Sequence, residues 1–189
     1  MVVTKVKQIK SVNKLSDGIK YIEDGAKTIG AELLDSDLNF PIKFVNGQPV
    51  SQLVSGNLII DVESAYSEMM QLKQLANLEK GRPINNEELF KNDVLAHHVI
   101  QSFSPEDNLT PEQVHEIGRK TALELTGGSH QFVIATHMDK GHLHNHIYIN
   151  STNSVTLNKF RWQKGTKKAL EQISDKYADL AGAKILENK

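Results

Sequence analysis

Hydrophobic residues follow two different periods along the chain, and these periods predict alternating strands and helices. Residues 2–9 alternate apolar and polar side chains, as a half-buried strand does. Residues 93–103, 130–137 and 142–151 are expected to be further strands. An Asn-Gly pair at 46–47, between two short apolar runs, indicates a β-hairpin. Together these segments supply the strands of a sheet.

Four other segments have the spacing of amphipathic helices. Ser16 or Asp17 is expected to cap the first helix. A capping box between Thr110 and Gln113 is expected to open the third helix, and Gly127 to end it. The expected helices cover approximately residues 17–29, 61–78, 111–126 and 163–183. With the strands, they predict an α+β fold in which helices flank a largely antiparallel central sheet.

Composition narrows the class of protein. The 189 residues are 39% hydrophobic, enough for one domain with a real core, and we expect a single domain over 1–189. The chain has no cysteine, which excludes disulfides, thiolate zinc sites and cysteine nucleophiles. The first residues lack a signal peptide's apolar core, and no run reaches the ~18 apolar residues of a membrane span. We therefore expect a soluble, cytoplasmic protein without membrane insertion.

The net charge of −1 conceals an uneven distribution. Residues 1–30 carry six lysines against three acidic residues, and residues 153–189 carry eight basic residues against four acidic ones. Residues 31–128 carry seven basic and fifteen acidic residues. If the two basic ends meet, they can form a local basic site on a nearly neutral protein. A solvated helix face explains the same charges equally well.

Four of the eight histidines lie within the ten residues 137–146. In a strand, successive side chains point to opposite faces of the sheet. One face is therefore expected to carry His142, His144, His146, Tyr148 and Asn150. The other is expected to carry Leu143, Ile147 and Ile149. This pattern predicts that one face of the strand carries the side chains of a functional site and that the other face packs into the core.

The clustered histidines have the spacing of metal ligands. Neutral imidazole binds divalent metal ions, and His144 and His146 project side by side from the strand. The third ligand has two candidates, His137 at the end of the neighbouring strand and His142 beside the pair. Asp139 is placed to hydrogen-bond a ligating imidazole and fix its tautomer. Such a site can polarise a substrate, activate water or orient a phosphate.

The stretch HMDKGHLHNHIYIN, residues 137–150, resembles the third motif of the conjugative relaxases. These nucleases nick plasmids and integrative elements at the transfer origin. The matching positions are His137, Asp139, His144, His146 and Asn150. Asn145 departs from the motif, whose simplest form has a hydrophobe between the paired histidines.

Three further stretches resemble the relaxases in the same order along the chain. GIKYIEDGAKT, residues 18–28, resembles the first motif, which carries the nucleophilic tyrosine in an early helix. LVSGNLI, residues 53–59, resembles the second motif, in which a Ser-Gly turn contacts DNA near the nick. Residues 96–118 resemble the family's central strand and helix. The resemblance implies a fold related to rolling-circle replication initiators, in the N-terminal nuclease domain of a longer protein.

The resemblance also implies a reaction. Tyr21 would attack the scissile phosphate and form a 5′-phosphotyrosyl link, leaving a free 3′-hydroxyl for later rejoining. Mg²⁺ or Mn²⁺ held by His137, His144 and His146 would offset charge on the phosphate. Ser55 and Asn150 would position the DNA backbone. Tyr66, Tyr148 and Tyr177 are weaker candidates for the nucleophile.

The expected partners are single-stranded origin DNA with a hairpin, a relaxosome accessory protein and a conjugation coupling protein. Arg161, Trp162 and Lys164 are expected to contact the single strand, unless Trp162 instead belongs to the core. Two rival functions remain. A histidine-triad nucleotide hydrolase would need a hydrophobe at Asn145, and a non-catalytic origin-binding module would keep the same residues without using them.

Overall fold

A computed structural model describes residues 2–22, 29–32, 42–45, 48–81, 94–137 and 142–183. Its main sheet has five strands in the order β1-β6-β8-β7-β5, and every neighbouring pair is antiparallel. The strands are β1 (Val2–Ile9), β5 (Val54–Asn57), β6 (Ala96–Phe103), β7 (His130–His137) and β8 (His144–Asn153). The expected α+β fold with an antiparallel sheet is confirmed.

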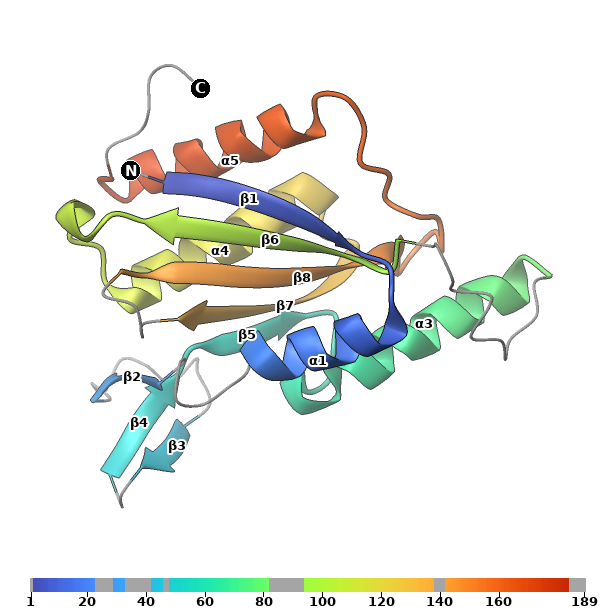
Figure 1. Cartoon of the computed structure of the whole chain (residues 1–189), viewed down its shortest axis with the longest axis horizontal. Coiled ribbons are helices and arrows are strands. Elements are labelled where there is room, and N and C mark those ends of the chain that lie inside the picture. The colour runs from blue at the N-terminus through green and yellow to red at the C-terminus, as the bar shows by residue number, and fades with distance from the viewer. Residues whose placement is uncertain are drawn as a thin grey trace.

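Helices cover both faces of this sheet (Figure 1). The helices are α1 (Val12–Ile22), α3 (Ala65–Glu79), α4 (Pro111–Thr126) and α5 (Thr166–Leu180), with 3₁₀ turns η1 (Val62–Ser64) and η3 (Pro105–Asp107). On one face α1 and α3 pack around Tyr148 of β8. On the other face α4 and α5 pack on Ile147 and Ile149, through Ala122 and Leu170. No helix within the described ranges combines the length and apolar character that crossing a membrane requires.

A smaller sheet precedes β5. It contains β2 (Ile29–Glu32), β4 (Gln48–Gln52) and β3 (Ile42–Val45), in that order and antiparallel. The pairing of Val45 with Gln48 confirms the expected hairpin, although residues 46–47 themselves lie outside the described residues.

The first helix differs from the sequence prediction. It begins at Val12, and the hydroxyl of Ser11 lies 3.4 Å from the backbone nitrogen of Lys14, as an N-terminal cap does. The predicted cap at Ser16 or Asp17 is therefore wrong, because the buried stripe of α1 already starts at Leu15, one turn before Ile19. The helix also does not extend to Ile29, which lies in β2.

The third predicted helix is confirmed in detail. Thr110 accepts from the backbone of Gln113, whose side chain accepts from the Thr110 backbone. Pro111 occupies the first turn, and Gly127 ends α4 with a positive φ of 71°. The helices predicted near 61–78 and 163–183 are confirmed as well, with ends that differ by a few residues.

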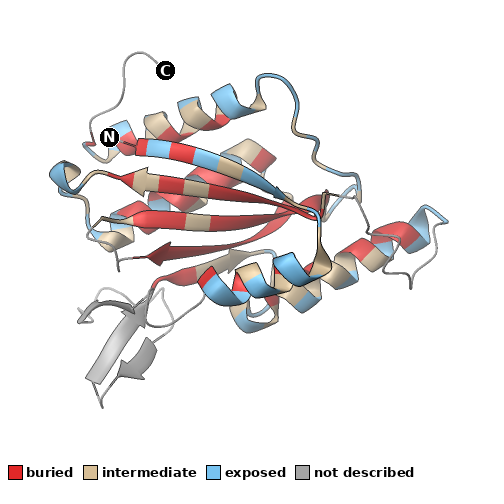
Figure 2. Cartoon of the chain, in the orientation of Figure 1, coloured by how far each residue is buried: buried red, intermediate tan, exposed pale blue. Residues whose placement is uncertain are grey.

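The central strand β8 pairs with β7, and this register places His137 opposite His144. Every residue of β7 is buried, whereas the edge strand β1 has exposed positions (Figure 2). Tyr148 belongs to the core on the α1 side, and Ile147 and Ile149 to the core on the α4 side. The predicted division of β8 into two faces is therefore confirmed.

Candidate active site

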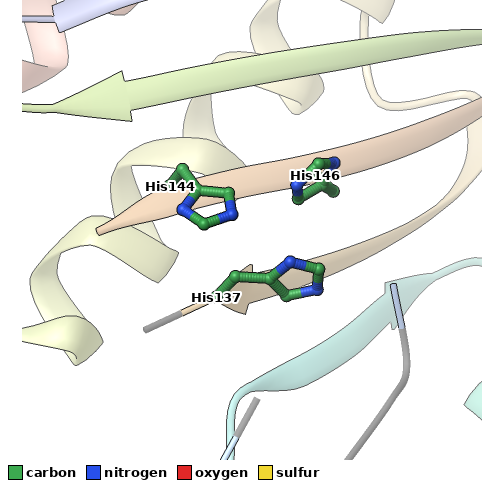
Figure 3. A group of neighbouring side chains, drawn as sticks. All are labelled: His137, His144 and His146. Carbon is green, nitrogen blue, oxygen red and sulfur yellow. The ribbon is translucent and has the colours of Figure 1, made fainter. Parts of the chain in front are cut away.

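Three histidine side chains converge at one end of the β7–β8 pair (Figure 3). His137 is the last residue of β7, and His144 and His146 open β8. Each offers a ring nitrogen, and these nitrogens lie within 4.8 Å of one another. His137 and His144 are buried, and His146 is partly buried. The antiparallel register creates this group, because it places the end of one strand beside the start of the next.

The helix α1 fixes the orientation of His137. Its Nε2 lies 2.8 Å from the backbone oxygen of Ile22, the last residue of the helix. A carbonyl oxygen only accepts, so Nε2–H is the donor and a neutral His137 carries its lone pair on Nδ1. The bond also satisfies a carbonyl at the helix end. His137 thus joins the end of α1 to the histidine group.

His98 of β6 fixes a second member of the group. Its Nε2 lies 2.9 Å from Nδ1 of His146, and its ring stacks on that of Tyr148, with ring centroids 4.3 Å apart. Burial lowers the pKa of His98 to about 4, so its ring is neutral near neutral pH. If Nδ1–H of His146 is the donor, Nε2 of His146 carries the lone pair.

No role was assigned to His98 from the sequence. Two adjacent histidines in a strand must point to opposite faces, so either His97 or His98 had to share the face of the histidine group. The signal was present, but assigning it needed the order of strands in the sheet. His97 points to the opposite face, where its ring lies against Phe160 and Trp162.

The histidine group has the chemistry of a divalent-metal site. Its members are imidazoles from two adjacent strands, and metal–imidazole bonds of about 2.1 Å need only small ring movements from nitrogens this close. Contacts to Ile22 and His98 orient two of the rings, as partners of metal-bound histidines usually do. His142 lies beside His144, with ring centroids 5.2 Å apart, but is outside the group of three. Asp139 lies outside the described residues.

Tyr21 lies beside the histidine group. Its ring centroid is 6.0 Å from that of His137 and 6.4 Å from that of His146, in both cases edge to face. Its side chain is 47% exposed although it belongs to a docked helix, because Ile19 and Ile22 take the buried positions of the last turn. Tyr21 is therefore accessible to a large substrate at the edge of the cluster.

A glycine lets α1 approach the sheet this closely. A Cβ atom on Gly18 would lie 2.1 Å from the hydroxyl oxygen of Tyr148, closer than any real contact allows. The helix therefore lies directly on Tyr148, and Tyr21 follows almost one turn later. Gly18 thus contributes to the placement of Tyr21.

The other three tyrosines, all in the described part of the chain, are placed differently. Tyr148 is buried beneath α1, and burial raises its pKa to about 12. Tyr66 packs against the α1-side core, and burial raises its pKa as well. Tyr177 is on α5, beside Lys120, Lys176 and Glu124.

Ser55 and Asn150, the two residues expected to position the DNA backbone, both hydrogen-bond to other groups of the protein. Ser55 Oγ lies 2.7 Å from Nε2 of His115 and accepts from Arg119 at 2.8 Å, on the α4 side of β5. The Asn150 amide is fully buried, where it donates to Gln131 and accepts from the backbone of Thr152. A DNA contact by Asn150 would require these bonds to break.

The three residues expected to bind a single strand precede α5. Arg161 and Lys164 are exposed. Trp162 is partly buried against the α4-side core, with its ring 5.6 Å from that of His97. The structure thus places Trp162 at a junction between core and surface.

Comparison with known proteins gives consistent results. A family model described as the relaxase MobA/VirD2-like nuclease domain matches residues 46–182. The chain is 41% identical over 215 aligned residues to the group II intron-interrupted relaxase LtrB of Lactococcus lactis, covering 99% of the chain and 38% of that protein. It is 34% identical over 127 residues to the protein rlx of Staphylococcus aureus, covering 67% of the chain and 36% of that protein. The chain spans little more than a third of the length of these relatives.

Proposed function

The chain belongs to the relaxases of the MobA/VirD2-like nuclease-domain family, and on that premise we propose that it nicks and rejoins one DNA strand at a transfer origin. The observation that carries the proposal is the position of Tyr21, an exposed hydroxyl-bearing side chain at the edge of the three-histidine group. The substrate is single-stranded origin DNA with a hairpin arm beside the nick.

In the proposed reaction, the hydroxyl oxygen of Tyr21 attacks the scissile phosphorus. The new bond joins phosphorus to the tyrosine oxygen, and the bond between phosphorus and the 3′ oxygen breaks. The phenolic proton leaves the tyrosine, and the departing 3′ oxygen gains one. One phosphate ester replaces another, so the 3′-hydroxyl can attack the tyrosyl ester in the reverse reaction and rejoin a strand.

His137, His144 and His146 hold the divalent ion in this proposal. When bound, the ion would supply positive charge that offsets the charge developing on the phosphate. Of the two ions expected, three neutral imidazoles favour Mn²⁺, because Mg²⁺ prefers oxygen ligands. His98 keeps the His146 ring in one orientation, and the Ile22 carbonyl does the same for His137.

The accessible surface favours Tyr21 over the other tyrosines as the nucleophile. Tyr148 is the nearest competitor, but its hydroxyl lies beneath Gly18 and cannot reach a DNA strand while α1 is docked. Tyr177 lies on the opposite side of the sheet, next to α4. We further propose that a relaxosome accessory protein and a coupling protein act with the whole protein.

The proposal is tested by trapping the covalent intermediate. Labelled single strands from the transfer origin of the element that encodes the chain are incubated with protein and Mn²⁺, then treated with acid. A phosphotyrosyl adduct survives the acid, whereas the phosphohistidine of a nucleotide hydrolase does not. Mass spectrometry should place the adduct on the peptide that contains Tyr21.

The matched variants are Tyr21→Phe and Tyr177→Phe, each of which removes one hydroxyl. Tyr21→Phe should keep its fold and its metal binding but form no adduct, and Tyr177→Phe should react as the unchanged protein does. An adduct on another residue, or an active Tyr21→Phe protein, would refute the assignment of the nucleophile. Specific binding of origin strands without any adduct would identify a non-catalytic origin-binding module.

A further inference from the structure

A cavity of about 360 Å³ lies at the end of the sheet opposite the histidine group. Its walls come from the end of α4, from His130 at the start of β7, from Asn153 at the end of β8 and from the connection to α5. The volume falls within the range of about 300–1,000 Å³ that is usual for small-molecule sites.

The connection that forms one wall is held in a fixed shape. The side-chain oxygen of Asn153 accepts from the backbone of Val155 and Thr156, at 2.8 and 3.0 Å. The chain then returns along β8, where the backbone nitrogen of Phe160 donates to the oxygen of Ser151 at 2.6 Å. The cavity wall is therefore fixed by hydrogen bonds from its backbone to Asn153 and Ser151, and not by its exposed side chains.

The cavity is positively charged. Lys159 and Arg161 line it, and none of its described lining residues carries a carboxylate. Residues 153–168 contain five basic residues and no acidic residue. Cations on a fixed wall match the chemistry of a phosphate group.

The same cavity offers contacts for a nucleobase. Phe160 provides an aromatic ring, and Asn158 provides an amide. His130 is buried, and its Nδ1 lies 2.7 Å from the Asn150 carbonyl oxygen, so Nδ1–H donates. Burial lowers the pKa of His130, which favours a neutral ring with an acceptor lone pair on Nε2. Exocyclic amino groups of bases are suitable donors to such an acceptor.

We propose that this cavity binds one phosphate-bearing nucleotide of the substrate strand, several nucleotides from the scissile phosphate. Lys159 and Arg161 contact the phosphate, and Phe160 and His130 contact the base. Asn153 is seven residues beyond His146 on β8, a distance of about 23 Å at 3.3 Å per residue. Phe160 lies on the α4 face of the sheet, whereas the histidine group lies on the α1 face. A strand that reaches both sites must therefore be longer than this distance, which alone corresponds to about seven stacked nucleotides.

This inference rests on the proposed function, because it takes the ligand to be part of the nicked strand. A free mononucleotide offers the same phosphate and base, so the experiment must separate the two sources. A strand that reaches both the histidine group and the cavity gains affinity over one that reaches a single site, because the second contact is intramolecular.

The test measures the affinity of labelled mixed-sequence strands of 4 and 16 nucleotides in the presence of Mn²⁺. The double variant Lys159→Ala/Arg161→Ala removes the two cations that line the cavity. The control, Lys167→Ala/Lys168→Ala, removes two exposed cations from the adjacent start of α5 without touching the cavity. Thermal unfolding checks that both variants remain folded.

The cavity variant should bind the 16-nucleotide strand about tenfold more weakly than the unchanged protein, with little change for the 4-nucleotide strand. The control should change either affinity by less than about threefold. Equal losses of affinity in the two double variants would refute nucleotide binding in the cavity, since they would indicate binding to a diffuse basic surface. Equal losses on the short and long strands would also refute it.

A second measurement separates free nucleotide from strand. Addition of dCMP should shift the NMR amide signals of Asn158 and Phe160 weakly, with a millimolar dissociation constant. Binding in the micromolar range would assign the cavity to a free nucleotide and overturn the proposal. Adduct formation is measured with the unchanged protein. A missing adduct there would contradict the proposed nicking reaction, whereas the comparison of strand lengths tests the cavity.

Discussion

The central pair of strands, β7 and β8, has two faces that are both rich in polar side chains but are organised differently. On the α1 face, His137, His144 and His146 bring three imidazole nitrogens to one point. On the α4 face, Thr136 and Asn145 alternate with these histidines, and their side chains hydrogen-bond to each other at 2.7 Å. The α1 face brings together nitrogen atoms that can bind a metal ion. On the α4 face, the polar side chains hydrogen-bond to other groups of the protein.

The α4 face contains a directed chain of hydrogen bonds. Arg119 donates to the hydroxyl of Ser55, and this oxygen lies 2.7 Å from Nε2 of His115. Nδ1 of His115 lies 2.8 Å from the Thr136 hydroxyl, which donates to the Asn145 amide oxygen. A neutral His115 that accepts at Nε2 and donates at Nδ1 satisfies every member of this chain. Burial and the nearby Arg119 guanidinium lower the pKa of His115 to about 3, consistent with that neutral form.

Asn145 completes the network. Its amide nitrogen donates to Gln101 and to the backbone oxygen of Val114, at 3.0 and 2.7 Å. A Cβ atom on Gly118 would lie 2.5 Å from that nitrogen, so α4 lies directly on it. The difference between the two faces explains why a polar residue stands between two histidines, because Asn145 ties β8 to β6 and α4 behind the site.

The largest effect is expected from a substitution that removes one histidine from the group on the α1 face. His146→Ala should lower Mn²⁺ affinity and adduct formation by more than about 100-fold, because it removes a ligand and not merely a ligand's partner. Its free energy of unfolding without metal should change by no more than about 1 kcal/mol, because the side chain is partly exposed. Calorimetry with Mn²⁺ and urea unfolding measure the two quantities. Unchanged metal affinity would exclude His146 as a ligand.

The second prediction concerns a substitution that interrupts the hydrogen-bond network of the α4 face. Asn145→Leu keeps the approximate size but leaves Thr136, Gln101 and the Val114 carbonyl without their amide partner. We expect the free energy of unfolding to fall by about 3 kcal/mol. Urea denaturation gives the value, and Mn²⁺ affinity of the folded variant should remain within about threefold. If metal binding fell as far as it does in His146→Ala, the two faces would not act separately.

A smaller effect is expected at His98, which supports the histidine face from the neighbouring strand. His98→Phe keeps a ring to stack on Tyr148 but removes the nitrogen that bonds to His146. We expect Mn²⁺ affinity to fall about tenfold. The matched control is His97→Phe, which changes the adjacent residue on the other face. Equal losses in the two variants would show that His98 acts through packing alone.

The last expected effect, small near neutral pH, is a dependence of stability on pH that belongs to the α4 face. His115 is neutral and buried when folded, with a pKa of about 3, and its ordinary value of 6.5 applies when unfolded. The unfolded state therefore binds the extra proton first as pH falls. The contribution of His115 is complete above about pH 6.5 and decreases by about 1.4 kcal/mol per unit toward pH 3. Unfolding curves of His115→Gln across this range should have a slope lower by that amount.

The sequence predicted those features that depend on local periodicity. Alternation along residues 142–151 was enough to separate the histidines from Ile147 and Ile149, because a strand exposes alternate side chains to opposite faces. The capping box at Thr110 was equally local and equally reliable. These features need no knowledge of which strands are neighbours.

The features that were missed depend on contacts between distant parts of the chain. The bond between His137 and Ile22 joins residues 115 positions apart, and that between His98 and His146 joins residues 48 apart. Neither has a sequence signal without the strand order and register. Asn145 was noted only as a departure from a motif, because its partners lie in β6, β7 and α4.

The bond between His137 and the end of α1 has a thermodynamic consequence. An ion that holds the His137 ring in place also favours the docked position of the helix that carries Tyr21, so the two equilibria are linked. Linkage is reciprocal: docking of α1 raises the ion's affinity by the factor by which the ion favours docking. A DNA strand that engages Tyr21 would therefore help to retain the ion, and the loaded site would hold its nucleophile more firmly than the empty one.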